Sequence, residues 1–166
     1  TKAATAANGE LEEIVVTASL RPEPVTRIPV STTVLDAETL HAAGLQHFGD
    51  VLGLVPNLNW AGGTSRPRFF QLRGIGELEQ YQGAPNPSVG FLIDEIDFSG
   101  VGMPATLFDV EQIEVLRGPQ GPRYGANALA GLIKLNTHDP DPEFSLQTQA
   151  MTGEDGLWSA GVQTGG

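Results

Sequence analysis

The side chains of this chain that could do chemistry are acidic residues, histidines and arginines. The middle of the chain carries two short acidic stretches: Glu77, Glu79, Asp94, Glu95 and Asp97. Such carboxylates could hold calcium or act as a pair in hydrolysis, but the regular Asp/Asn spacing of a calcium loop is absent, which favours a solvated acidic surface. The histidines show no metal-ligand spacing and are interpreted as structural: His41, His47 and His138. No metal site is predicted.

Catalytic motifs are missing from the sequence. The chain has no cysteine, which excludes a thiol nucleophile, a disulfide and a thiolate zinc site. The glycine-rich loop at residues 118–121 is not followed by Gly-Lys-Ser/Thr, so it is not a phosphate-binding loop, and no serine lies in a nucleophile elbow. The sequence therefore predicts that the protein is not an enzyme, and no cofactor is expected.

Two arginines stand at predicted strand ends and are followed by glycine. Arg73 precedes Gly74, and Arg117 precedes Gly118 and Pro119. Glycine allows a tight turn and proline fixes one torsion, so each guanidinium is expected on a rigid corner from which it can grip a carboxylate with two hydrogen bonds. The alternative is a pair of solvated surface arginines.

A short apolar run near the N-terminus, residues 14–18, has the Val and Ile content of a β-strand. Small and polar residues precede it and the proline-rich residues 21–29 follow it, so no fold of its own is expected to support it. Its backbone groups would then be free to pair with the sheet edge of another protein. A frayed first strand of the domain is the other interpretation.

Composition places the chain as one loop-rich folded domain with extensions. It has 166 residues, of which 21 are glycine and 12 are proline. This combined glycine and proline content is below the level of about 25–30% that is typical of low-complexity chains.

The net charge of −11 argues against nucleic acid as a partner, because phosphate binding relies on Lys and Arg. The chain lacks the apolar run of about 18 residues that a transmembrane helix needs. It begins at Thr1 without Met, as a secreted protein does after removal of its leader, or as a shortened chain does.

Local patterns predict an α/β (α+β) body, a small mixed β-sheet with short helices and long loops. Strands are expected at residues 30–35, 69–73, 89–97, 112–117 and 132–137. Helices or helical turns are expected at residues 36–43, 47–54, 106–110 and 126–130. The first of these helices is expected to be capped by Asp36 and ended by Gly44. Long loops are expected at residues 58–67, 74–88 and 118–127.

Residues 145–163 alternate polar and apolar side chains on either side of a turn at residues 153–156. This pattern is typical of a hairpin in an outer-membrane β-barrel, where apolar residues face lipid and polar residues face the lumen. A soluble edge hairpin has the same pattern. Since two strands cannot close a barrel, most of the barrel is expected outside this chain.

Three stretches together resemble one protein family. Residues 13–18 are similar to a TonB box: Glu13, Ile14, Val15, Val16, Thr17 and Ala18. Residues 72–74 with 89–96 are similar to the middle of a plug domain, and residues 113–121, with 124–126 and 131–133, to its most specific signature. On these motifs the chain is identified as a member of the TonB-dependent outer-membrane receptors over residues 12–140. The signature loop departs from the usual pattern at Pro122, Arg123 and Ala130.

The resemblance implies a flexible N-terminal segment with the TonB box at residues 1–29, a plug domain at residues 30–140, and the first strands of a barrel of about 22 strands at residues 141–166. It implies that residues 13–18 bind the C-terminal domain of TonB. It also implies that Arg73 and Arg117 lock the plug to acidic residues of the barrel, which belongs to the same protein or to a separate chain. The protein is then expected in the outer membrane of a Gram-negative bacterium, with the N-terminal segment facing the periplasm.

The resemblance also implies that outward loops at residues 59–67, 75–88 and 98–104 form the floor of a substrate site. The side chains expected to bind substrate are Trp60, Arg66, Arg68, Gln80 and Tyr81. An iron chelate such as a ferric siderophore is the commonest substrate class of the family, while receptors for cobalamin and carbohydrate share the same motifs. The alternative function is a free-standing soluble plug-like protein, such as a toxin domain or adaptor, imported through a receptor of this family.

Overall fold

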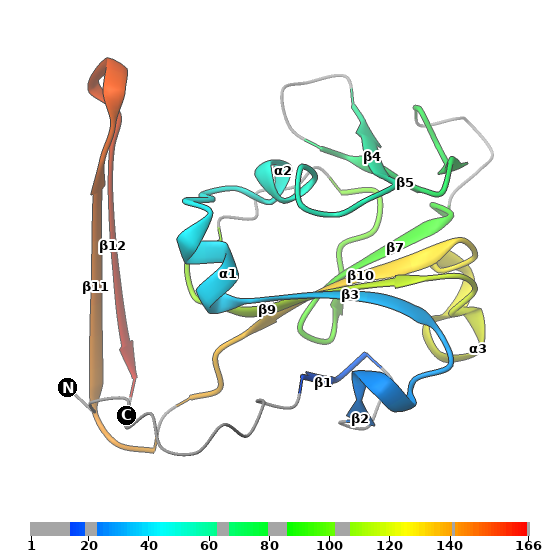
Figure 1. Ribbon diagram of the computed structural model, residues 1–166, viewed down its shortest axis with the longest axis horizontal. Coiled ribbons are helices and arrows are strands. Elements are labelled where there is room, and N and C mark those ends of the chain that lie inside the picture. Colours follow the sequence, from blue (N-terminus) through cyan, green and yellow to red (C-terminus); the bar gives the residue numbers. More distant parts are fainter. Residues whose placement is uncertain are drawn as a thin grey trace.

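The computed structural model describes residues 14–18, 23–62, 67–79, 86–101, 107–140 and 142–165. These residues form a layered body with a separate hairpin beside it (Figure 1). Among them, no helix has the length and hydropathy needed to span a bilayer.

A five-stranded mixed sheet forms the centre of the body. Its strands lie in the order β3 (Ser31–Asp36), β9 (Val110–Arg117), β10 (Gly131–Thr137), β7 (Val89–Ile93) and β8 (Ile96–Asp97). Neighbours pair antiparallel except β10 and β7, which are parallel. Central strands β9, β10 and β7 are buried on both faces, and most of their side chains are apolar, as expected for strands covered on both sides.

Helices α1 (Ala37–Ala42) and α2 (Phe48–Val51) cover what we call the upper face of the sheet (Figure 1). A small sheet of β4 (Leu58–Ala61), β5 (Phe69–Leu72) and β6 (Ile75–Gly76) lies beside them on the same face, with β5 against β7 (Figure 1). Phe48, Phe70 and Phe91 join these layers, with ring centroids 5.1–5.4 Å apart. Asp36 caps α1 as predicted, because its Oδ1 accepts a hydrogen bond from the Thr39 amide at 2.7 Å.

Two groups of short elements cover the lower face of the sheet. Strands β1 (Val15–Val16) and β2 (Glu23–Pro24) pair beneath it, followed by the 3₁₀ turn η1 (Val25–Arg27). Helix α3 (Gly121–Tyr124) and the 3₁₀ turn η2 (Gly125–Asn127) complete this side. A second apolar cluster fills the space between them: Val16, Ala18, Leu92, Leu116, Ala128 and Leu132.

The predicted hairpin is present and consists of β11 (Ser145–Thr152), η3 (Glu154–Gly156) and β12 (Trp158–Gly165). It stands beside α1 (Figure 1). Its even-numbered residues, among them Leu146, Trp158 and Val162, are exposed on the side away from the body. The odd-numbered side faces the body, where Gln163 Nε2 donates to Asp109 Oδ1 at 2.6 Å. The alternation thus separates an apolar face from a polar face.

Several local predictions are wrong. The loop predicted at residues 74–88 contains β6, the loop predicted at residues 118–127 contains the helix at Gly121–Tyr124, and the helical turn predicted at residues 126–130 ends at Asn127. Residues 58–61, predicted as loop, form β4, because Trp60 and its neighbours pair with β5. The predicted strand at residues 89–97 is broken at Asp94, whose φ of 52° makes a turn and whose carboxylate accepts hydrogen bonds from the Thr137 amide and hydroxyl. The described part of residues 106–110 is a turn with Asp109 at φ 68° and not a helical turn.

Candidate functional site

The N-terminal segment of residues 14–18 is docked on the lower face of the sheet. Val16 and Ala18 are fully buried in the second apolar cluster. Val15 pairs with Pro24, and the Val25 amide donates to the Ile14 carbonyl at 3.0 Å. The prediction that this segment has no fold to support it is therefore wrong for residues 14–18, because distant residues of the sheet provide the support.

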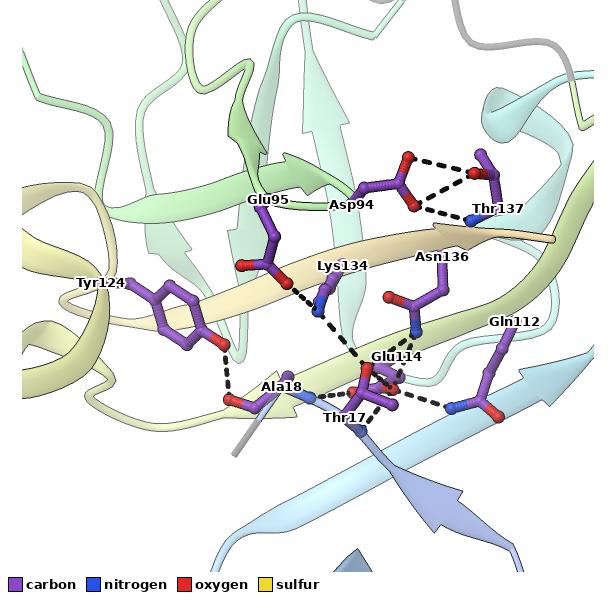
Figure 2. A network of polar contacts seen from close by, with 10 residues as sticks. All are labelled: Thr17, Ala18, Asp94, Glu95, Gln112, Glu114, Tyr124, Lys134, Asn136 and Thr137. Carbon is purple, nitrogen blue, oxygen red and sulfur yellow. Dashed lines mark hydrogen bonds and ion pairs between the residues drawn. The ribbon is translucent and has the colours of Figure 1, made fainter. Parts of the chain in front are cut away.

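Glu114 holds this segment through both oxygens of its carboxylate (Figure 2). Its Oε1 accepts hydrogen bonds from the Thr17 amide and hydroxyl, both at 2.8 Å, and its Oε2 accepts one from the Ala18 amide at 2.8 Å. Gln112 Nε2 and Asn136 Nδ2 donate to the same Oε1 at 2.8 and 2.9 Å. Glu114 has no exposed surface, and hydrogen bonding to its charged form is what makes such burial tolerable.

Two carbonyl groups of the segment also have side-chain partners. Gln112 Nε2 donates to the Val15 carbonyl at 3.0 Å, and the Tyr124 hydroxyl donates to the Ala18 carbonyl at 2.6 Å. Asn136 Nδ2 donates to Thr17 Oγ1 at 3.0 Å. The segment is thus bound through its main chain by side chains of β9 and α3, and through the Thr17 hydroxyl by Asn136 of β10 (Figure 2).

Charged neighbours surround the docked segment. Lys134 is buried and pairs with Glu95 Oε1 at 2.9 Å, while its Nζ lies 3.4 Å from Thr17 Oγ1. Burial, followed by the nearby carboxylates of Glu95 and Glu114, raises the pKa of Tyr124 to about 12. Tyr124 therefore keeps its proton and donates to the Ala18 carbonyl at any physiological pH.

Arg73 and Arg117 lie close together on the upper side of the sheet. Arg117 is nearly buried at the end of β9 and donates to Thr33 Oγ1 at 2.8 Å and to the Pro56 carbonyl at 3.1 Å. Arg73 is exposed just after β5, with φ 55°. Burial, and then the Arg73 guanidinium, lower the pKa of Arg117. Within the described residues neither arginine forms an ion pair with a carboxylate.

The described parts of the three predicted outward loops come together at the end of the body that carries β4 and β5. Arg68 Nε donates to the Gly100 carbonyl at 3.0 Å, and Gly100 packs near Pro87. Glu77 accepts hydrogen bonds from the Ser88 amide and hydroxyl, which fixes the base of the second loop. Trp60 is partly exposed, and Figure 1 shows its strand on the opposite side of the sheet from β1.

Four of the predicted site residues fall outside the described residues: Glu13, Arg66, Gln80 and Tyr81. Sequence reasoning missed the groups that hold the segment: Gln112, Glu114, Tyr124, Lys134 and Asn136. The available signal was a charged residue inside each of two apolar strands, Glu114 and Lys134. In the described part of the chain no group of acidic or histidine side chains is arranged to hold a metal ion. The chemistry of the site is the binding of a peptide main chain.

Comparison with known proteins identifies the family. Residues 24–132, more than half of the chain, match the TonB-dependent Receptor Plug Domain. The chain belongs to this family. Its predicted family and fold class are confirmed, and the relatives below are receptors and transporters and not enzymes.

Among the relatives of this plug domain is the pesticin receptor of Yersinia pestis, which is 33% identical over 113 residues, or 68% of this chain and 16% of the receptor. The vitamin B12 transporter BtuB of Vibrio vulnificus is 25% identical over 92% of this chain and 25% of the transporter. The solved structure of the ferric yersiniabactin uptake receptor FyuA from Yersinia pestis has 28% identity and a TM-score of 0.59, over 79% of this chain and 20% of FyuA. The chain therefore spans a quarter or less of the length of these relatives.

Proposed function

We propose that this chain is the plug of a TonB-dependent outer-membrane transporter. It occludes a barrel, binds substrate on the loops above β4 and β5, and couples to the C-terminal domain of TonB through residues 13–18. The observation that supports coupling most directly is the docked segment itself. Residues 14–18, which include the short strand β1, are held through their main chain on the side of the sheet opposite the substrate loops (Figure 1).

The proposed substrate is a small molecule, most simply a ferric siderophore. The structural relatives include receptors named for ferric yersiniabactin and for ferripyoverdine. Trp60 and Arg68 are exposed on the substrate side, where an aromatic ring and a cation suit an anionic chelate. Arg66, Gln80 and Tyr81 remain proposed contacts.

Arg73 and Arg117 are proposed to lock the plug to acidic groups of the barrel wall. Two guanidiniums close together repel each other, and the Arg117 side chain is largely removed from water. Carboxylates of a surrounding barrel would supply the negative charge for these two guanidiniums, since no carboxylate among the described residues forms an ion pair with them. The barrel is in the outer membrane in this proposal, and residues 14–18 face the periplasm.

The alternative of a free-standing soluble plug-like protein has less support. The outer face of the hairpin exposes Trp158, Val162 and Leu146, with exposed fractions of 76%, 67% and 62%. A soluble protein would bury such a row, whereas a barrel strand turns it towards lipid.

We propose that residues 14–18 bind TonB weakly when they pair with it as an added strand. The few backbone hydrogen bonds contribute about 0.5–1.5 kcal/mol each, and the cost of ordering the segment, about 1–2 kcal/mol per residue, cancels most of this gain. Weak binding suits a contact that is made and broken in every transport cycle.

The test uses the full-length receptor that carries this chain. Val15→Pro and Val16→Pro each remove an N–H and restrict a torsion, so uptake of ligand should fail while ligand affinity stays normal. Val15→Thr, which keeps the main chain and a β-branched side chain, is the matched control and should transport normally. Wild-type uptake by both proline variants, in cells that need TonB for that ligand, would show that residues 14–18 are only the first strand of the domain.

A further inference from the structure

A cavity of about 300 Å³ lies between the body of the plug and the hairpin. Its walls come from α1 and the residues that follow it, from residues 107–110 at the start of β9, and from β11 and β12. Figure 1 shows α1 on the body with the hairpin opposite it. None of the described residues that line the cavity belongs to the proposed substrate loops. The volume reaches the lower end of the range of about 300–1,000 Å³ that is usual for small-molecule sites.

Two contacts at the edge of the cavity hold its walls in place. Gln163 Nε2 donates to Asp109 Oδ1 at 2.6 Å. Phe108 packs so closely on Gly161 that a Cβ at this glycine would lie 2.6 Å from Phe108 Cε2. The body and the hairpin are therefore fixed against each other before any ligand arrives, and a ligand does not bear the cost of ordering the walls.

The polar side chains that line the cavity have unused hydrogen-bonding capacity. The side chains of Gln149 and Ser159 form no hydrogen bond with the described residues. The Gln46 carboxamide donates to the thioether sulfur of Met151, which is a weak acceptor. A ligand oxygen would be a better acceptor for this group, and the free carboxamide and hydroxyl can each donate and accept.

The described lining residues include no Asp, Glu, Lys or Arg. The imidazoles of His41 and His47 complete the polar part of the lining, and the larger part is apolar: Leu40, Leu45, Leu107, Phe108, Val110 and Met151. A charged ligand would lose hydration here without gaining an opposite carboxylate, ammonium or guanidinium group. An apolar frame that carries a few hydroxyl or amide groups would instead find partners for both parts of its surface.

We propose that this cavity is a binding site for a small uncharged molecule that carries hydroxyl or amide groups on an apolar frame, such as an N-acetylated monosaccharide. The bound molecule contacts α1 and the hairpin at once and holds them together. The site is separate from the substrate loops and from residues 13–18, so it goes beyond the proposed transport function.

The test measures protection of a cysteine in the full-length receptor, free of other cysteines. Ser159→Cys places a thiol on the cavity wall, and Val162→Cys lies on the opposite face of the same strand, outside the cavity. N-acetylglucosamine is the probe, because it is uncharged and carries hydroxyl groups and an amide. At about 100 mM it should slow alkylation of Ser159→Cys by iodoacetamide about threefold, the factor for a dissociation constant of about 50 mM. Alkylation of Val162→Cys should not change.

Two results of this measurement would overturn the proposal. A Ser159→Cys thiol that does not react with iodoacetamide would mean that small molecules do not reach the cavity. Equal rates with and without the sugar would mean that the cavity does not bind it.

Gln149→Trp tests whether protection depends on the cavity itself. The larger side chain fills the space, so the sugar should no longer slow alkylation of Ser159→Cys. Thr148→Trp makes the matched change on the outer face of β11, outside the cavity, and should keep the protection. The ratio of rates with and without sugar removes any difference in the baseline rate. Protection that survives Gln149→Trp would overturn the proposal, because the sugar would then act elsewhere.

Glucose and glucuronate test the preference for an uncharged ligand without a second substitution, which keeps the proposal testable if Gln149→Trp does not assemble. The two sugars share a ring and differ by one carboxylate. Glucose should protect Ser159→Cys and glucuronate should not, whereas equal protection by both would overturn the assigned ligand class. None of these measurements involves TonB or transport, so their outcome is independent of the proposed function.

Discussion

Glu114 and Lys134 stand directly opposite each other on β9 and β10, yet each is bound to a different partner. Lys134 forms its ion pair with Glu95 at the β7–β8 turn, and Glu114 uses its carboxylate for the Thr17 and Ala18 amides. Opposite charges on neighbouring strands stabilise a sheet by their proximity alone. Because Lys134 pairs with Glu95, the oxygens of Glu114 are available for the segment.

Raising the pH should destabilise the plug in the alkaline range. The pKa of Tyr124 is raised to about 12 when the segment is docked, against about 10 for an unperturbed tyrosine. A raised pKa on an acid means that the folded plug favours the neutral phenol, which donates to the Ala18 carbonyl, so this contribution to stability is complete below pH about 10 and is lost between about 10 and 12. The measurement is denaturant unfolding of the full-length receptor across this range. Tyr124→Phe should remove the Tyr124 part of the pH dependence, and an identical profile in this variant would contradict the assignment.

Arg117→Ala should loosen the plug within the full-length receptor. The substitution removes hydrogen bonds to Thr33 Oγ1 and the Pro56 carbonyl, and it leaves barrel carboxylates unpaired if the proposed lock exists. The cost is about 3–5 kcal/mol for a dry pair and far less for a wet one. Thermal stability and passive leak of small solutes are the measurements, with the exposed Arg123→Ala as control. Unchanged stability and leak in Arg117→Ala would rule out the lock.

Gly131→Ala should destabilise the plug. A Cβ at Gly131 would lie 2.4 Å from Leu72 Cδ1 and 2.5 Å from the Leu116 carbonyl oxygen, and the carbonyl belongs to the paired strand β9. Because that backbone cannot move without breaking the sheet, we expect a cost of about 1–3 kcal/mol, the usual range for overpacking. Denaturant unfolding of the plug in the full-length receptor measures it. Gly121→Ala, whose added Cβ has open space around it, is the control and should be near neutral.

The two faces of the hairpin should differ in their tolerance of charge. Val162→Arg places a cation on the exposed outer face, where lipid is proposed, and should lower the stability of the assembled receptor by about 2–4 kcal/mol near the bilayer midplane. Gln147→Arg, on the opposite face of the same hairpin, should cost much less. The stabilities of the two receptor variants are compared by refolding each of them into lipid vesicles at increasing denaturant concentration. Equal costs would argue that the outer face of the hairpin does not contact lipid.

The sequence by itself determined the elements whose signals are local. The Asp36 cap and Gly44 turn of α1 were predicted, because a capping side chain acts within three residues of its own position. The alternation of β11 and β12 was predicted because its period of two is read directly from neighbouring residues. The signature at residues 113–121 indicated the family for a similar reason. Its glycines and proline are neighbours in the sequence and together specify one turn.

Only the tertiary structure decided where the N-terminal segment lies and what holds it. Thr17 and Glu114 are 97 positions apart in the sequence. No local pattern connects a five-residue segment near the N-terminus with a carboxylate in a central strand. A run of Val and Ile has the same strand preference whether its partner is another protein or its own domain. The outcome is set by long-range burial, because the lower face of the sheet needs Val16 and Ala18 to cover it and Glu114 needs their amides to satisfy its charge.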